Sequence, residues 1–175
     1  GHGASAALVT GVAKSCLLTL RLMSAGAAPS PDQVLSSLNR VLFEACKGKL
    51  LMTMCMIQLD VDTGEILLSN AGHESPLCIR KEVVESGKGK AEEFFARGER
   101  LGFAADSVYS CERYSISAGD CLLLYTDGIT EAKDGKGAEW GERQVKKSLK
   151  KALSSSASLA TAKEELLKDL RSFTS

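Results

Sequence analysis

The stretch CLLLYTDGITEA, residues 121–132, joins an apolar run directly to the polar triplet Thr126, Asp127 and Gly128. Five of its first six residues are apolar or aromatic, if the cysteine is counted as apolar. This composition predicts a central buried strand, Cys121–Tyr125. Asp and Gly are ordinary turn residues, so a structural turn or a helix N-cap is one interpretation of Asp127. The other is a functional carboxylate at the end of a rigid strand, where Gly128 leaves room beside the backbone.

The composition describes an electrically neutral chain with enough apolar residues for a sizeable core. Its 175 residues, 44% of them hydrophobic, suit one domain. The 22 basic residues balance 22 acidic ones, so there is no basic field and nucleic acid is not an expected partner. The six cysteines form no CxxC or Cys/His cluster, which favours reduced thiols in a cytoplasmic protein over a zinc site or disulfides. Lys14 and Arg21 interrupt the apolar stretch 6–28, so no membrane-spanning helix and no membrane contact are expected.

Hydrophobic spacing predicts helices in the first and last parts of the chain. A first helix is expected from Ala4 to about Met23. Ser30, Pro31 and Gln33 resemble a capping box with proline at the first helical position, which predicts a second helix there. Two more helices are expected, one from about Glu139 and one over 159–173.

The middle of the chain is predicted to form strands separated by turn-rich segments. Apart from Cys121–Tyr125, the expected strands are Leu50–Leu59, Glu65–Ser69, Leu77–Val84 and Val108–Ile116. The segment DVDTGE (60–65) predicts a hairpin turn that pairs the first two of these. Phe94 and Phe95 are expected to return the chain to the core. Helices, then antiparallel strands, then helices favour a layered α+β domain over alternating βαβ units.

Three blocks of this sequence, in their order and spacing, resemble the SpoIIE/RsbU-type branch of the PPM (PP2C-like) serine/threonine phosphatases. They are GHGASAALV (1–9), SNAGHESPLCIR (69–80) and GDCLLLYTDGITEA (119–132), with the LG element Leu101–Gly102 between the last two. The resemblance covers nearly the whole chain. It implies an αββα-type sandwich of two antiparallel sheets flanked by helices. The abrupt ends suggest that residues 1–175 are a single domain truncated at both ends and lacking terminal strands.

The resemblance also implies a reaction, the hydrolysis of phosphoserine or phosphothreonine on a protein with two Mn²⁺ or Mg²⁺ ions as cofactors. Paired divalent cations activate water and neutralise phosphoryl oxygens, and these hard ions prefer oxygen ligands. Asp127 is therefore expected to be a metal ligand, with Gly128 in its vicinity. Glu131 is expected either in the second shell of the metal or at the start of a helix, where the dipole favours it.

Further candidates are assigned mainly structural roles. Asn70 and His73 lie in the NAGH turn, and each is a candidate for a contact to a metal ligand. His73 either orients a ligand or a neighbouring loop by hydrogen bonding or, the favoured alternative, is a structural residue of the turn. Thr126 is expected to be a capping hydroxyl, and Thr53 to contribute packing. In the wider PPM family a DGHGG segment carries a metal-binding aspartate and a histidine proposed in proton transfer. In the branch that this chain resembles the aspartate comes earlier, so His2 is not expected to have that role and is expected in a turn that leads into the first helix.

The resemblance places the family's other two main metal carboxylates outside this chain, one before Gly1 and one after Ser175. The chain is therefore expected to bind metal weakly or not at all and to hydrolyse little phosphate, and no catalytic residue is assigned within it. The implied substrate is a phosphorylated STAS-type anti-anti-sigma protein of bacterial signalling. Sensor or receiver domains are expected elsewhere in the same parent chain. One alternative is a catalytically inactive module that keeps the fold for regulation or protein binding. Another is a domain with a purely structural role.

Overall fold

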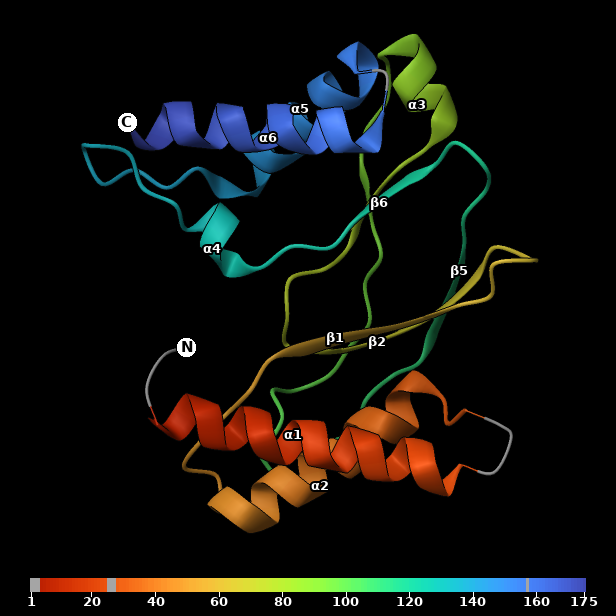
Figure 1. Ribbon diagram of the computed structural model, residues 1–175, viewed down its shortest axis with the longest axis vertical. Coiled ribbons are helices and arrows are strands. Elements are labelled where there is room, and N and C mark those ends of the chain that lie inside the picture. Colours follow the sequence, from red (N-terminus) through yellow and green to blue (C-terminus); the bar gives the residue numbers. More distant parts are fainter. Residues whose placement is uncertain (1–3, 25–27, 157) are drawn as a thin grey trace. The chain divides into compact units, whose positions relative to one another are not determined.

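The computed structural model describes residues 4–24, 28–156 and 158–175, and Figure 1 shows its elements. The helices are α1 (Ala4–Met23), α2 (Pro31–Cys46), α3 (Lys81–Ser86), α4 (Asp127–Thr130), α5 (Gly141–Ser155) and α6 (Leu159–Thr174). The strands are β1 (Met54–Leu59), β2 (Glu65–Ala71), β3 (Leu77–Ile79), β4 (Glu92–Glu93), β5 (Glu112–Ser115) and β6 (Cys121–Leu123).

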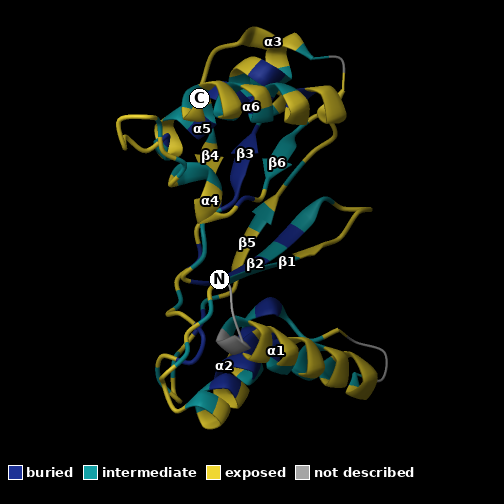
Figure 2. Ribbon diagram, turned by 60° about the vertical axis from the view of Figure 1, so that its left-hand side comes forward, coloured by how far each residue is buried: buried dark blue, intermediate teal, exposed yellow. Residues whose placement is uncertain are grey.

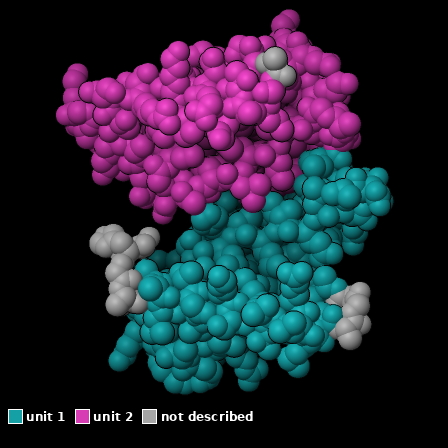
Figure 3. Space-filling model, viewed as in Figure 1, with its two compact units in different colours: residues 1–75, 95–116 teal, residues 76–94, 117–175 magenta. Residues whose placement is uncertain are grey.

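Contacts divide the chain into two compact units, which Figure 3 shows in different colours. Unit 1 comprises residues 1–75 and 95–116, and unit 2 comprises residues 76–94 and 117–175. Each unit contains one three-stranded antiparallel sheet together with helices. The chain therefore has the predicted α+β class with two antiparallel sheets flanked by helices.

The sheet of unit 1 has the strand order β1-β2-β5. Strands β1 and β2 form the predicted hairpin, whose register pairs Met54 with Ala71 and Leu59 with Ile66. The Asp60 carboxylate closes the turn between them by accepting the backbone N–H groups of Asp62 and Thr63. Local side-chain bonds of this kind favour a turn over continued strand.

Helices α1 and α2 lie on one face of this sheet (Figure 1). The core of unit 1 forms where α2 packs against β2 and β1, and its fully buried side chains include Leu35 and Leu38 of α2. The Gln33 side chain accepts the Ser30 N–H at 3.1 Å, which confirms the predicted capping box. The amphipathic pattern and the cap thus fix the start of α2 and the face that it buries.

Helix α1 is the described helix that meets the length and hydropathy requirements of a membrane span. Its segment Ala6–Met23 has a mean hydropathy of 1.5. Lys14 and Arg21 do not take the segment below those requirements, so the expectation that these charges exclude a span does not hold by this measure. Only length and composition indicate a membrane span here, and core helices of soluble proteins meet the same requirements. In unit 1, α1 packs against α2 and buries Val9 and Ala13.

The sheet of unit 2 has the strand order β4-β3-β6. Strand β3 is completely buried, and Figure 2 shows it in dark blue between its two neighbours. Its Leu77 and Ile79 share a core with Val145 and Leu149 of α5 and Leu166 of α6. In the part of the sheet that the structure describes, β3 is therefore central and β6 is an edge strand. The predicted central position of Cys121–Tyr125 is wrong.

The five predicted strands exist; four of them are shorter than expected, whereas β2 continues two residues beyond the predicted Ser69, to Ala71. The segment Leu50–Thr53 precedes β1 and pairs only through an isolated bridge between Met52 and Leu101. The strand expected over 108–116 is reduced to β5, and the strand expected over 121–125 ends at Leu123. Apolar composition predicted the presence of these strands, whereas pairing partners decide where they end.

The largest correction concerns Lys81–Val84, which was predicted as strand and belongs to helix α3. The Arg80 carbonyl accepts the backbone N–H groups of both Val83 and Val84, at 2.9 and 3.1 Å. The Asp120 carboxylate accepts the Lys81 N–H at 2.9 Å and so removes a donor from the strand ladder. These contacts stop β3 at Ile79 despite the β-branched valines.

Two further expectations about burial are corrected. Phe94 is buried as predicted, but Phe95 is 61% exposed and contributes its backbone to hydrogen bonds with the Tyr114 hydroxyl. All six cysteines are free, as expected, although Cys111 is exposed and not part of a core. Burial raises the pKa of Cys55 and Cys78 to about 11, which keeps both as unreactive thiols.

Candidate functional site

Asp127 is the first residue of α4, directly after the connection that follows β6. Its backbone carbonyl accepts the Glu131 N–H at 2.7 Å and the Thr130 hydroxyl at 3.1 Å. Its side chain is exposed and makes no hydrogen bond or ion pair with any residue that the structure describes. The backbone of Asp127 is thus fixed by the helical turn while its carboxylate is available to a ligand.

The two neighbours of Asp127 leave its surroundings open. Thr126 occupies the N-cap position of α4, but its side chain makes no capping hydrogen bond, so the predicted capping role is wrong. A Cβ atom built on Gly128 would meet only the Thr126 hydroxyl oxygen, at 3.6 Å. The space beside Gly128 therefore agrees with the expectation that the backbone is approachable at this point.

Glu131 lies at the C-cap of α4, with φ of −86° and ψ of 0°. Glu131 therefore ends this helix, and the expectation that it begins one is wrong. At this end the helix dipole does not favour a carboxylate. The nearby Asp134 carboxylate accepts the backbone N–H groups of Lys136 and Ala138 at 2.8 and 2.9 Å. Asp134 thus stabilises its own loop, whereas the role of Glu131 toward a metal stays a prediction.

Asn70 and His73 form one rigid turn in unit 1. The Asn70 side chain donates to the His73 carbonyl and accepts the His73 N–H, both at 2.8 Å. Gly72, between them, has φ of +66°, which suits glycine. The buried Asn70 therefore stabilises the turn, whereas a role of Asn70 or His73 toward a metal ligand stays a prediction.

His73 also contacts the loop that precedes β1. Its Nδ1 lies 3.1 Å from the Thr53 hydroxyl oxygen. Thr53 is exposed, so the expectation that it contributes packing is wrong, and its hydroxyl instead orients the imidazole. The turn histidine thus links two segments of unit 1, which agrees with the predicted orienting role by hydrogen bonding.

The LG element is fixed by a buried residue that sequence reasoning missed. The Asn39 side chain, on α2, accepts the Gly102 N–H at 2.8 Å and donates to the Ala104 carbonyl at the same distance. Gly102 has φ of +84°, and a Cβ there would come within 2.8 Å of the Leu50 carbonyl oxygen. A polar residue on the otherwise apolar face of α2 was the only signal in the sequence that could have indicated this role.

A second missed residue is Asp120, whose side chain is only 5% exposed. Besides the Lys81 N–H, it accepts the Ser117 N–H and Arg80 Nη1, both at 3.0 Å. Burial opposes ionisation, but the hydrogen bonds from Ser117, Lys81 and Arg80 outweigh it and lower the pKa of Asp120. These partners occupy the carboxylate, so the aspartate of the GD pair stabilises unit 2 and is not available to a ligand.

The candidate residues therefore fall into two groups that the structure describes separately. Asp127, Gly128 and Glu131 lie together on unit 2, and Asn70 and His73 lie together on unit 1. His2 lies outside the described residues.

The described residues alone do not fit a metal centre. No three His, Cys, Asp or Glu side chains within residues 4–24, 28–156 and 158–175 are grouped so that they could hold an ion. Hard divalent cations require several oxygen ligands, and anionic ligands are the main determinant of their affinity. Asp127 thus offers one carboxylate ligand, and the other described residues do not complete the set.

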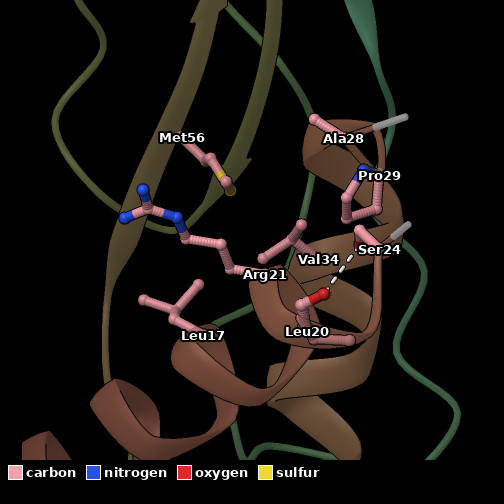
Figure 4. Close-up of a pocket in the computed structure, with 8 residues that line it drawn as sticks. All are labelled: Leu17, Leu20, Arg21, Ser24, Ala28, Pro29, Val34 and Met56. Carbon is pink, nitrogen blue, oxygen red and sulfur yellow. Dashed lines mark hydrogen bonds between the residues drawn. The ribbon is translucent and has the colours of Figure 1, made fainter. Parts of the chain in front are cut away.

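Unit 1 also contains an open cavity of about 430 Å³ between the end of α1, the start of α2 and β1 (Figure 4). Its lining is mainly apolar and includes Leu17, Val34 and Met56, with Arg21 as its single charged residue. None of the candidate site residues lines it. The cavity therefore has no part in the chemistry argued from Asp127.

The fold belongs to the PP2C class of phosphatase domains, as solved structures show. The SiaA-PP2C domain of Pseudomonas aeruginosa matches 99% of this chain with a TM-score of 0.78 and 19% identity, over 65% of its own length. The RsbU and RsbW domains of Rv1364c from Mycobacterium tuberculosis match 99% of this chain with a TM-score of 0.76 and 25% identity, over 46% of that structure. More distantly, RsbX in complex with magnesium matches with a TM-score of 0.63 and 14% identity, over 100% of this chain and 70% of its own.

The sequence defines the family more narrowly. Residues 1–175 match the family described as Stage II sporulation protein E (SpoIIE), and the chain belongs to that family. Phosphoserine phosphatase RsbU of Bacillus subtilis (strain 168) is 28% identical over 110 residues, which are 61% of this chain and 30% of RsbU. The family resemblance drawn from the sequence blocks is thereby confirmed. The chain spans less than a third of that curated relative and less than two thirds of the SiaA domain.

Proposed function

We propose that the chain is the larger part of the catalytic domain of a metal-dependent protein serine/threonine phosphatase. The observation that carries the proposal is the unpartnered Asp127 carboxylate in the YTDG block of a SpoIIE-family chain. Membership of the family and the relationship to a phosphoserine phosphatase support the reaction class. Phosphate release from a phosphoserine peptide by the full-length protein, with and without Mn²⁺, tests it.

The proposed substrate is a phosphorylated STAS-type anti-anti-sigma protein of bacterial signalling, in the cytoplasm. The similarity to a protein that combines RsbU and RsbW domains supports a regulatory setting of this kind. Sensor or receiver domains are proposed for the same parent chain. Chemically, phosphate-ester hydrolysis requires neutralised phosphoryl oxygens and an activated water, and Mn²⁺ or Mg²⁺ ions supply both when bound.

In this proposal Asp127 holds metal together with carboxylates that the described residues do not provide. The rest of unit 2 positions Asp127, because the helical bonds of α4 to its carbonyl fix the backbone. Glu131, four residues further on, is proposed to orient the ligands around the ion. Asn70 and His73 are proposed to shape a second loop of the same domain through their mutual hydrogen bonds.

Calorimetric titration with Mn²⁺ distinguishes this chain from a version extended at both ends. We expect residues 1–175 to bind no tighter than about 1 mM, because one carboxylate with carbonyls and water offsets little of the cost of dehydrating the ion. The extended version is expected to bind about tenfold tighter or better, and to lose that gain with Asp127→Asn. Micromolar binding by the short chain would mean that the ligands lie elsewhere in these residues.

A catalytically inactive module of the same fold is the second candidate. The described residues fit either candidate, because no three of their His, Cys, Asp or Glu side chains are grouped so that they could hold an ion. The same titration separates the two candidates, because an inactive module would show weak binding in both the short and the extended versions.

A further inference from the structure

A group of cations on unit 2 has no part in the core or in the candidate site. Helix α5 carries one acidic residue, Glu142, and five basic ones, which are Arg143, Lys146, Lys147, Lys150 and Lys151. An amphipathic surface helix commonly balances opposite charges on its exposed face. The excess of positive charge on α5 therefore calls for an explanation.

Ion pairs within the unit account for only part of this charge. Lys146 pairs with Glu93 and Glu142, and Lys151 pairs with Asp169 at 3.2 Å. Arg143 and Lys147 are exposed and make no hydrogen bond or ion pair with any described residue. Two cations of the helix are thus left without a counter-charge inside the unit.

The free cations share one face of α5 with Lys150. Arg143, Lys147 and Lys150 are spaced by four and then three residues, which places them in one row along a helix. The Lys150 ammonium donates to the Gly89 carbonyl at 3.3 Å and so brings this row to the loop after α3. Lys88 and Lys90 flank Gly89, and both are exposed. We call these five residues, Arg143, Lys147, Lys150, Lys88 and Lys90, the cationic edge.

The cationic edge begins beside the segment that carries Asp127. Helix α4 packs against α5, and the Trp140 N–H donates to the Ala132 carbonyl at 2.8 Å, which ties the start of α5 to the loop after α4. Arg143 is the third residue of α5. The edge therefore runs from the neighbourhood of α4 along α5 to the Lys88–Lys90 loop.

We propose that the cationic edge binds an acidic segment of the protein substrate, outside the phosphorylated residue itself. This inference rests on the proposed phosphatase function, because a protein substrate extends beyond the reacting phosphate and can contact α5. A row of charges of one sign on a short surface steers and orients a partner of opposite charge. Nucleic acid fits less well, since its affinity comes from many phosphate contacts along an extended basic surface and the overall charge of this chain is zero.

Fluorescence anisotropy of a labelled decapeptide of alternating Glu and Asp tests the surface directly. The peptide carries no phosphate, so its binding does not depend on metal or on hydrolysis. We expect binding by residues 1–175 that weakens several-fold between 50 and 200 mM NaCl, on the order expected for screened surface charges. The double change R143E/K147E is expected to weaken binding at least tenfold.

The matched control is R40E/K49E, which makes the same change of charge at two exposed residues of unit 1. It is expected to alter the affinity less than twofold. Equal losses in both variants, no loss in R143E/K147E, or tighter binding of duplex DNA or anionic vesicles than of the peptide would overturn the proposal.

In the full-length protein, R143E/K147E should lower kcat/KM for an acidic phosphopeptide about tenfold and leave hydrolysis of a small aryl phosphate unchanged. Failure of the phosphatase proposal would abolish both reactions but leave peptide binding intact. Failure of the cationic-edge proposal would abolish the difference between the two substrates.

Discussion

Replacing Asp127 by Asn in the full-length protein is expected to abolish Mn²⁺-dependent hydrolysis of a phosphoserine peptide. The change removes one anionic ligand. Because changes to residues that only hydrogen-bond to a metal ligand already cost up to about 100-fold, we expect a loss larger than that. Stability should be unaffected, because the side chain is exposed and bonds to no described residue. Turnover and the unfolding transition, measured on the same samples, separate a lost ligand from a lost fold.

The matched control for this change is Asp106→Asn, which removes the same charge from an exposed loop residue. It should retain wild-type turnover. If Asp127→Asn also retains near wild-type turnover, then Asp127 is not the metal ligand and the assignment from the family blocks is wrong at this residue.

Asp120→Asn is expected to have the opposite effect, a large loss of stability. The substitution removes a nearly buried charge that pairs with Arg80. It also places the NH₂ group of asparagine beside the N–H groups of Arg80 and Ser117, which are donors themselves. Arg80 keeps Glu92 as a partner, so the expected cost is that of leaving buried donors unsatisfied, about 1–3 kcal/mol. Trp140, the single tryptophan of the chain, is buried in the core of unit 2, so its fluorescence reports urea unfolding of that unit. Asp62→Asn, at an exposed hairpin residue, should change stability by less than about 0.5 kcal/mol.

The pH dependence of this effect follows from the lowered pKa of Asp120. Because its pKa is lower in the folded state than the ordinary value of 3.8, the carboxylate stabilises unit 2 above that value. The contribution is lost as pH falls through the folded-state pKa. The difference in unfolding free energy between wild type and Asp120→Asn should therefore be constant near neutral pH and shrink below about pH 4. A difference that stays constant into strong acid would contradict the proposed role of the ionised carboxylate.

Local sequence signals predicted the features that depend on neighbouring residues. The capping box at Ser30 and the turn at Asp60 each involve bonds within a few residues, and both are present. The NAGH turn follows the same rule, because the Asn70 side chain bonds to the backbone N–H and carbonyl of His73, three residues further on. Such contacts are encoded where they occur and need no knowledge of the rest of the fold.

Features that depend on distant residues could not be predicted. Asn39 bonds to residues 63 and 65 positions away in the chain, and Asp120 bonds to Lys81, 39 positions away. The β-branched Val83 and Val84 favour a strand by propensity, but the contacts of Arg80 and Asp120 turn this segment into α3. Asp127 combines the two cases. Its position at a turn follows from the local sequence, whereas its partners in a metal site depend on distant residues and do not.

The measurement that tests the central claim most directly is phosphate release by the full-length protein from a phosphoserine peptide. The account predicts release that requires Mn²⁺ or Mg²⁺, stops when EDTA is added and resumes when excess metal is restored. The unfolding transition reported by Trp140 should be present throughout, which shows that the protein is folded in each condition. A folded protein that releases no phosphate with either metal, or one whose release is indifferent to EDTA, would contradict the account.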